Sequence, residues 1–282
     1  MSKIFKCKTR EGYIIKGLGE LLTNNLKVGC FEIKNNGIFL RMFDYHRNTL
    51  VDLSLLAENF SIYNFNYETP FFMGLNLNHF NKMLKSIKKK DWLELYIKSD
   101  NLTELSIKTI PKENTRITIS GIKIQSIQNI NIDIPENYRK PIIVQSSEFQ
   151  KMCKDLNSIG STNITVISYN YQITFIANAD GILKREVVFG ESGDSDVDSA
   201  EEKKNSDEEI YKATFSTDKL IKLLKIASLS STLQIFTANK NLPLLLRTNI
   251  GTLGKLAIFI KSNEIINQEL KNYDNSGSES DE

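Results

Sequence analysis

Apolar residues alternate with polar ones, or run together over short stretches, along most of the chain. This pattern predicts many short β-strands. The predicted strands are residues 28–33, 37–42, 50–55, 60–65, 93–98, 103–110, 117–124, 142–145, 164–168, 172–177, 182–189, 210–215, 233–237, 243–248 and 254–260.

Four other segments have the spacing of amphipathic helices, with apolar residues on one side only. They are residues 12–25, 78–88, 147–158 and 217–228. In the third segment, Phe149, Met152, Cys153 and Leu156 stand at positions i, i+3, i+4 and i+7. Strands therefore dominate the predicted structure, and the helices are spread among them.

The order of predicted helices and strands repeats along the chain, as a shift of numbering shows. A shift of 140 places Leu77–Lys85 on Thr217–Lys225 without a gap, and Leu93–Tyr96 on Leu233–Phe236. The two halves therefore share one plan. The predicted parts are an N-terminal domain of residues 1–124, an interdomain connector of 125–141 and a C-terminal domain of 142–262.

Charge is strongly segregated along the chain. Residues 191–209 contain nine acidic residues and two lysines, and residues 272–282 contain four acidic residues and no basic one. We expect a disordered acidic insert at 191–209 and a disordered acidic tail at 263–282. Without 191–209 and 272–282, the chain keeps 34 basic and 21 acidic residues. This excess is typical of a nucleic-acid-binding protein, with lysines that only solubilise the surface as the alternative.

Composition excludes several classes of protein. No stretch approaches the roughly 18 apolar residues that a membrane helix requires, so no membrane partner is expected. Cys7, Cys30 and Cys153 are odd in number and widely spaced, which excludes a disulfide framework and a CxxC metal site and favours a reducing compartment. His46 and His79 have no neighbouring cysteine or acidic pattern that would make a nucleophile or a metal site. We therefore expect no enzyme, no metal and no cofactor.

Five motifs carry a family resemblance. They are GIFLRMFDYHRNTLVDLSL at 37–55, FFMGLNLNHFNKMLKSI at 71–87, IDIPENY at 132–138, SSEFQKMCKDLNSIG at 146–160 and LPLLLRTNIGTLGKLAIFI at 242–260. In this order and spacing they resemble the eukaryotic and archaeal DNA sliding clamp, the proliferating cell nuclear antigen family. The resemblance implies an α+β fold of two similar clamp domains. Antiparallel sheets would lie outside and four helices on the inner face of a ring, usually a homotrimer.

The resemblance also implies how the subunits join. The segment 116–123 of one subunit would pair with 182–189 of the next, head to tail. Such pairing removes two unpaired sheet edges, which would otherwise favour aggregation.

Lysines recur at helical spacing on the predicted helices. They are Lys82 and Lys85 on the second helix, Lys151 and Lys154 on the third, and Lys219, Lys222 and Lys225 on the fourth. Their side chains would point away from the apolar side of each helix. The resemblance places these positions, with Lys16 of the first helix, on the inner wall of the ring. There they would contact DNA phosphates without base specificity, whereas an ordinary solvated face is the alternative for any one helix.

The resemblance further implies a pocket for short peptide motifs of partner proteins, between the connector and the C-terminal strand. The matching positions are Phe43, Arg47, Leu50, Ile132, Ile134, Pro135, Pro243 and Phe259. An apolar pocket of this kind accepts a one-turn helix with aliphatic and aromatic anchors. Without the resemblance, the apolar members of this set are ordinary core residues.

These inferences together predict a DNA polymerase processivity factor that encircles duplex DNA and tethers polymerase and other replication and repair proteins. The implied partners are duplex DNA, proteins with short clamp-binding motifs, a clamp loader and further copies of the chain. The alternatives are a monomeric or dimeric factor of the same fold that does not encircle DNA, and a nuclease that uses Asp44 and Asp52. The wealth of Asn, Lys and Ile suggests AT-rich coding, as in large DNA viruses and protozoa. The expected location is the nucleus or, for a virus, its replication site.

Overall fold

The computed structural model describes residues 2–113, 116–128, 130–169, 171–190, 210–238 and 241–277. The chain divides into two compact units. Unit 1 comprises Met1–Ile134, Lys225–Thr232 and Arg247–Ile258, and unit 2 comprises Pro135–Leu224, Leu233–Leu246 and Phe259–Glu282. The acidic insert predicted at 191–209 lies outside the described residues.

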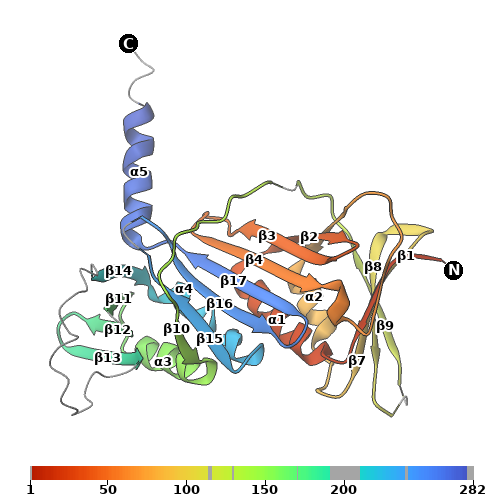
Figure 1. Cartoon of the computed structure of the whole chain (residues 1–282), viewed down its shortest axis with the longest axis horizontal. Helices are drawn as coiled ribbons and strands as arrows, with labels where there is room; N and C mark the ends of the chain where they lie inside the picture. The colour runs from red at the N-terminus through yellow and green to blue at the C-terminus, as the bar shows by residue number, and fades with distance from the viewer. Residues whose placement is uncertain are drawn as a thin grey trace, which may run out of the picture. The chain divides into compact units, whose positions relative to one another are not determined.

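Unit 1 combines antiparallel sheets with helices (Figure 1). Its elements are β1 (Lys3–Thr9), α1 (Gly12–Asn25), β2 (Val28–Lys34), β3 (Gly37–Phe43), β4 (Thr49–Leu56), the 3-10 helix η1 (Ala57–Asn59), β5 (Ile62–Phe65), β6 (Phe71–Asn76), α2 (Leu77–Leu84), β7 (Trp92–Lys98), β8 (Asn101–Ile110) and β9 (Thr118–Lys123). One sheet has the strand order β5-β1-β7-β8-β9, and β6-β2-β3-β4 are neighbours in another. The strands pair in antiparallel register.

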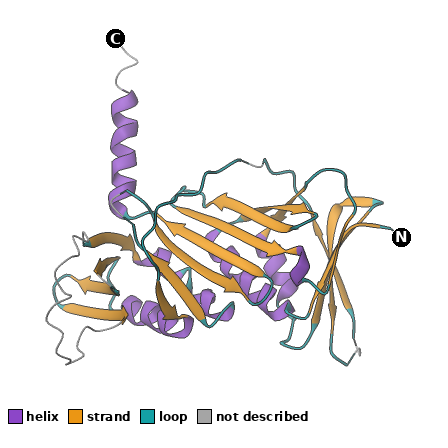
Figure 2. Ribbon diagram, viewed as in Figure 1, coloured by secondary structure: helices purple, strands orange, loops and turns teal. Residues whose placement is uncertain are grey.

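The second half of the chain repeats this combination of strands and helices. It contributes to both units, because Lys225–Thr232 and Arg247–Ile258 belong to unit 1. The remaining elements are β10 (Ile142–Gln145), α3 (Ser146–Ser158), β11 (Asn163–Tyr169), β12 (Gln172–Ala179), β13 (Leu183–Gly190), β14 (Tyr211–Ser216), α4 (Thr217–Ile221), the 3-10 helix η2 (Leu224–Ser228), β15 (Thr232–Phe236), β16 (Leu244–Ile250), β17 (Gly254–Ile260) and α5 (Asn263–Gly277). Strands β13-β12-β11-β14 form an antiparallel sheet. Strands alternate with helices in the order that the internal repeat predicts (Figure 2).

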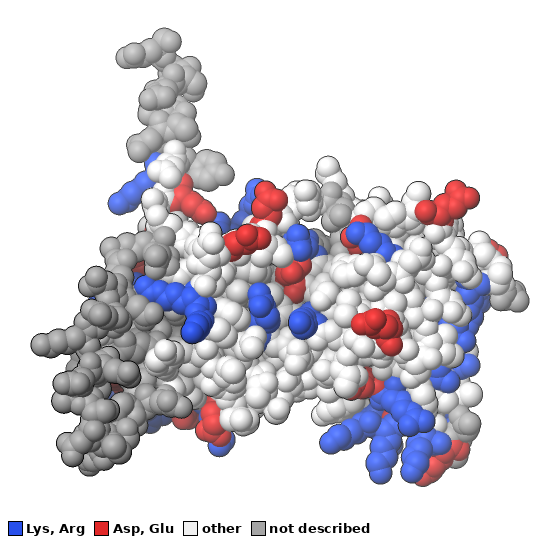
Figure 3. Space-filling view, viewed as in Figure 1, with Lys and Arg blue, Asp and Glu red and all other residues white. Residues whose placement is uncertain are grey.

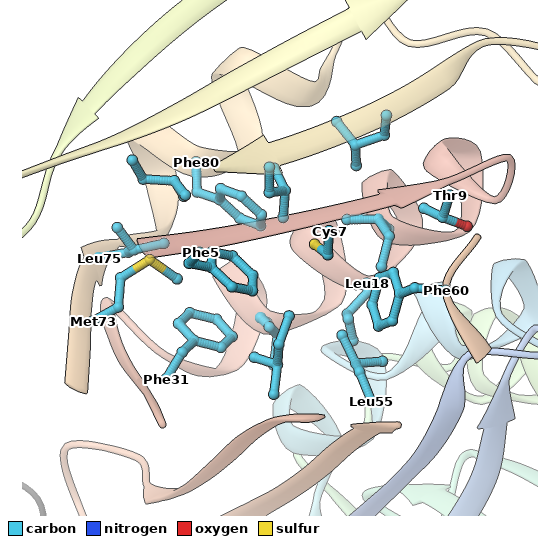
Figure 4. Close-up of a pocket in the computed structure, with 16 residues that line it drawn as sticks. Phe5, Cys7, Thr9, Leu18, Phe31, Leu55, Phe60, Met73, Leu75 and Phe80 are labelled. Carbon is cyan, nitrogen blue, oxygen red and sulfur yellow. The ribbon is translucent and has the colours of Figure 1, made fainter. Parts of the chain in front are cut away.

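The core of unit 1 lies between its sheets and helices. Ile15, Leu18 and Leu22 of α1 are at most 4% exposed. Phe5 and Cys7 of β1 face the same interior, where the side chains enclose an apolar cavity of about 30 Å³ (Figure 4). A void of this size with apolar walls is expected to stay dry. It is a gap in the packing and offers no ligand site.

The fourth predicted helix is interrupted. The segment 217–228 forms the short α4, followed by the 3-10 helix η2. The buried residues here recur at every third position: Leu220, Leu223, Ile226 and Leu229. A spacing of three matches the period of a 3-10 helix, so this geometry keeps the apolar side chains on one side. The other predicted helices agree with α1, α2 and α3 to within a few residues.

Two strands and one helix differ from the expected pattern. β1 and β6 are not among the predicted strands, although Phe5, Cys7 and Thr9 of β1 are buried and alternate with lysines. The tail expected to be disordered forms helix α5 over Asn263–Gly277. The Glu264 carboxylate of α5 accepts hydrogen bonds from the backbone N–H of Thr214 at 3.1 Å, which ties the start of the helix to β14.

Candidate nucleic-acid and partner interface

The second helix of unit 1 presents a basic side. Leu77, Phe80 and Leu84 of α2 are buried, whereas Lys82 and Lys85 are exposed. The helix begins at an N-cap, where the Asn76 side chain accepts a hydrogen bond from the backbone N–H of His79 at 3.0 Å. The same cap and apolar stripe that hold α2 in place therefore keep the two ammonium groups in solvent.

Lys16 of α1 has a different environment from the other lysines. It is half-buried, and its Nζ donates to the carbonyl oxygens of Lys85 at 2.7 Å and Ile87 at 3.4 Å. These carbonyls lie at the C-terminal end of α2, where a positive charge is stabilising. In this structure Lys16 joins α1 to α2.

Lys225 is also exposed and belongs to unit 1. Its Nζ forms an ion pair of 2.6 Å with Glu20 of α1. An exposed pair of this kind contributes little stability, and the lysine keeps hydrogen-bonding capacity for a phosphate.

The remaining lysines of the predicted set lie in unit 2. Lys151 and Lys154 of α3 are exposed, and Lys151 Nζ pairs with Glu148 at 2.7 Å. Lys222 is exposed as well, but Lys219 is half-buried and its Nζ is out of contact with solvent. The structure thus leaves six of the eight predicted lysines exposed: Lys82, Lys85, Lys151, Lys154, Lys222 and Lys225.

This arrangement is suited to contacts with a polyanion. A lysine ammonium is a hydrated point charge with rotatable donors, and it meets phosphates without a fixed bidentate geometry. Contacts of this type position a protein on nucleic acid but carry no sequence information.

The predicted partner residues of unit 1 lie on β3, on β4, in the loop between them and in the connector. Phe43 of β3 is half-buried and stands opposite the buried Leu50 of β4. The Arg47 guanidinium lies over the Phe43 ring at 5.5 Å from its centroid. Ile132 and Ile134 of the connector are both half-buried. Of these residues, Phe43, Ile132 and Ile134 present apolar surface, and Leu50 supports it from the core.

The connector is tied to β3 by a residue outside the predicted set. Arg41 Nη1 donates to the Ile132 carbonyl at 3.1 Å, and its Nε donates to Asp52 at 2.9 Å. The cross-strand pair of Arg41 and Asp52 is the sequence signal that would have indicated this role.

The predicted partner residues of unit 2 are joined by Tyr138. Its hydroxyl donates to the Pro243 carbonyl at 2.9 Å, and its ring packs against Phe259 at a centroid distance of 6.2 Å. Pro135 and Pro243 are half-buried, whereas Phe259 is 3% exposed. Burial raises the pKa of Tyr138 well above its usual range. Tyr138 is not among the predicted partner residues, although it ends the IDIPENY motif.

The two segments predicted to join subunits are both sheet edges within their units. β9 ends the five-stranded sheet, and β13 ends the sheet of unit 2. Each strand carries exposed apolar side chains. Ile119 of β9 is 59% exposed, and Val188 of β13 is 50% exposed. Unpaired strands with apolar side chains favour pairing with another chain.

Side chains that could ligate a metal do not cluster in the residues that the structure describes. No group of three or more His, Cys, Asp or Glu residues there could hold a metal ion. The three thiols are buried, and burial raises the pKa of Cys153 to about 12, so this group stays protonated at neutral pH. Among the described helices, none combines the length and the apolar character needed to cross a membrane.

Two family models match the chain. The model described as "Proliferating cell nuclear antigen, N-terminal domain" matches residues 4–135. The model described as "Proliferating cell nuclear antigen, C-terminal domain" matches residues 133–263.

Two viral proteins, each named "Probable DNA polymerase sliding clamp", are similar in sequence. The protein of Acanthamoeba polyphaga mimivirus is 26% identical over 227 residues, which cover 79% of this chain and 47% of that protein. The protein of Autographa californica nuclear polyhedrosis virus is 25% identical over 273 residues, which cover 94% of this chain and 99% of that protein. The chain therefore spans about half of the first relative and almost all of the second.

A solved structure has a similar fold. The crystal structure of Proliferating Cellular Nuclear Antigen from Entamoeba histolytica matches with a TM-score of 0.78 at 19% identity. The match covers 93% of this chain and 99% of that chain.

Proposed function

The chain belongs to the proliferating cell nuclear antigen family, and we propose from this premise that it is a DNA sliding clamp, a processivity factor for a DNA polymerase. It encircles duplex DNA and tethers the polymerase and other replication and repair proteins to it. The chain itself catalyses no reaction. It acts where DNA is replicated, in the nucleus or at a viral replication site.

One observation carries this proposal: exposed lysines occupy equivalent positions in the two halves of the chain. Lys82 and Lys222 are separated by the repeat distance of 140 residues, and so are Lys85 and Lys225. All four are exposed. A helix face that serves only solubility does not require the same positions to be basic in both halves.

Weak and numerous contacts explain how such a protein can hold DNA and still move along it. Each lysine–phosphate contact is electrostatic and independent of sequence. No base is gripped, so a shift along the duplex replaces one set of phosphates with the next. Enclosure rather than affinity then keeps the protein on the DNA.

Enclosure requires several subunits. We propose that β9 of one copy pairs with β13 of the next, head to tail. Each copy is rotated relative to the one before it, and the ring closes after three copies. Pairing of the two edges would cover Ile119 and Val188, which are half or more exposed in the single chain. A closed ring cannot thread onto DNA without ends, so a clamp loader is implied.

The polymerase is tethered through the predicted partner residues of each unit, with Phe43 the half-buried apolar candidate in unit 1 and Pro243 in unit 2. A short motif with apolar anchors would bind there. Tethering makes each rebinding of the polymerase an intramolecular event, which raises its effective concentration at the primer end.

Particle mass and processivity together test the proposal. Light scattering is expected to give the mass of three chains, and primer extension on circular single-primed DNA is expected to give longer products when clamp and loader are present. A particle of one or two chain masses that still extends the products would instead identify a factor that does not encircle DNA. Product lengths unchanged by the clamp would contradict the function itself.

A further inference from the structure

A basic groove lies in unit 1 beyond the end of α2. We use the name for the hollow lined by Lys88, Lys89 and Lys90 of the α2–β7 turn and by Lys112 and Arg116 of the β8–β9 loop, with a volume of about 770 Å³. All five cationic side chains are exposed. Figure 3 shows Lys and Arg side chains gathered at the lower right, where the five-stranded sheet ends.

The turn that carries the three lysines is held in one conformation. Asp91 is only 7% exposed, and its Oδ2 accepts a hydrogen bond from the backbone N–H of Lys88 at 2.9 Å. The backbone N–H of Asp91 donates to the Lys88 carbonyl at 3.1 Å. These two bonds close the turn from within and leave the three lysine side chains outside.

The basic groove has a net positive charge, because its five cationic side chains outnumber its two acidic ones, Asp91 and Glu113. Within the described part of the chain, none of its five cationic side chains forms an ion pair, whereas lysines elsewhere in unit 1, such as Lys3 and Lys34, do. Glu113 is the exposed acidic residue among the lining residues. A polyanion entering the groove would therefore meet five cationic groups beside two carboxylates, Glu113 and the buried Asp91.

The fold does not require these lysines. The repeat shift of 140 places Lys88, Lys89 and Lys90 on Ser228, Leu229 and Ser230. Leu229 is 2% exposed, and Ser228 Oγ donates to the Lys225 carbonyl at 2.7 Å. The C-terminal half thus uses the same positions for packing and capping, and the basic turn is confined to the N-terminal half.

We propose that the basic groove binds the phosphodiester backbone of duplex DNA, as a phosphate-binding site additional to the lysines of the helices. The proposal rests on the proposed clamp function and deepens it. The groove begins three residues after Lys85, so it continues the basic side of α2. Its lining contains no large apolar side chain that would anchor a peptide motif, which favours a nucleic-acid backbone over a protein segment.

The consequence is a contact that does not depend on enclosure. An open subunit would bind linear duplex through the groove, and a loaded ring would hold the phosphates more firmly beside the N-terminal half of each chain. Both effects would weaken steeply as salt rises.

The test compares two full-length triple variants. One is Lys88→Ser, Lys89→Ser, Lys90→Ser, which introduces the small polar residue of the repeat. The matched control is Lys27→Ser, Lys255→Ser, Lys271→Ser, which removes three exposed lysines outside the groove. Binding to a short linear duplex is measured across a salt series. Because each lost phosphate contact reduces the slope of log K against log salt by about 0.9, the groove variant should lose about two to three units and the control less than one.

An equal loss in both variants, or no loss in either, would overturn the proposal. A second variant, Lys112→Ser, changes the other loop outside the segment 116–123 and should lose about one unit, so a loss in both variants does not come from misfolding of the turn alone. A peptide with the sequence of residues 191–209 is added as a competitor. If the groove variant loses the peptide but keeps the affinity and salt dependence of the wild type for DNA, the groove is a peptide site and the proposal is wrong. Retention of the loaded wild type on circular DNA, read in the same preparations, reports the clamp function separately.

Discussion

Gly17 of α1 and Ser228 of η2 are packed so closely that a Cβ atom on Gly17 would clash with Ser228 Oγ. On the same helix, a Cβ on Gly19 would lie 3.1 Å from Leu84 Cδ1 of α2. The sequence Gly17-Leu18-Gly19 therefore brings α1 close to its helical neighbours in unit 1. This packing sets the positions from which Lys85 and Lys225 project.

Gly17→Ala is expected to destabilise the protein. The new methyl group must displace the Ser228 side chain, which costs about 1–3 kcal/mol as overpacking, while the better helix propensity of Ala returns up to about 1 kcal/mol. Urea unfolding should therefore show a net loss of roughly 1 kcal/mol. In a Ser228→Ala background the same change should be close to neutral. Equal losses in both backgrounds would show that the two residues do not interact.

Lys16→Met should lower stability more than it lowers DNA affinity. The variant keeps the length of the side chain but removes the ammonium that bonds the carbonyls of Lys85 and Ile87, which costs about 1 kcal/mol. The matched change Lys82→Met removes an exposed charge that makes no such bond. It should lower DNA affinity more than it lowers stability. Thermal unfolding and salt-dependent DNA binding of both variants measure the two effects. A Lys16→Met variant of full stability would contradict the capping role.

The stability of unit 1 should fall at acid pH through Glu94. This residue is 5% exposed, and its carboxylate lies 2.9 Å from Lys3 Nζ and 3.7 Å from Lys6 Nζ. Burial by itself raises the pKa of Glu94, but the hydrogen bond and charge of Lys3, with the charges of Lys6 and Lys108, hold that pKa below its ordinary value. In the unfolded chain a glutamate has a pKa of about 4.3, and above this pH the stabilisation by Glu94 is complete. It is lost as pH falls through the lower pKa that Glu94 has in the folded protein.

Glu94→Gln provides the comparison. Urea midpoints at about pH 6 and about pH 3 should differ less in this variant than in the wild type, because the variant has no carboxylate to protonate at this position. An unchanged difference between the two midpoints would exclude Glu94 as a source of the acid sensitivity.

Phe43→Ala is the cleanest substitution for testing the partner surface. Phe43 is half-buried, so its truncation should weaken binding of a clamp-binding peptide severalfold while the fold survives. Phe259→Ala removes a side chain that is 3% exposed and should cost about 3–5 kcal/mol of stability. Isothermal titration with the peptide, after a check of the unfolding midpoint, separates the two outcomes. Unchanged peptide affinity in Phe43→Ala would argue against this surface.

Much of the fold was readable from the sequence because each element has a clear apolar pattern. The family and the α+β class with two similar domains are confirmed by the matching family models and the similar solved fold. Helix α1 has the predicted bounds, since its apolar stripe and the following strand leave no ambiguity. The β1 strand is absent from the prediction although its lysines alternate with buried residues, because three lysines within seven residues lower the apolar content of the segment.

Other features of the fold depend on tertiary contacts, which the pattern of apolar residues does not show. The 3-10 helix η2 follows from buried residues three apart, and α5 is tied to β14 by the contact of Glu264 with Thr214, a residue fifty positions earlier. Among the lysines, spacing alone could not separate the exposed Lys82 from the engaged Lys16. The assignment of individual lysines to DNA, and of the partner residues to a groove, stays a prediction.

The account depends most on enclosure, and the lifetime of the loaded protein on DNA tests enclosure directly. Labelled clamp is loaded onto a nicked circular duplex, the free protein is removed, and the circle is then cut once by a restriction enzyme in half of the sample. We predict that the clamp stays on the intact circle and leaves the cut DNA by sliding off its ends. Equal rates of loss from circular and linear DNA would contradict the central claim.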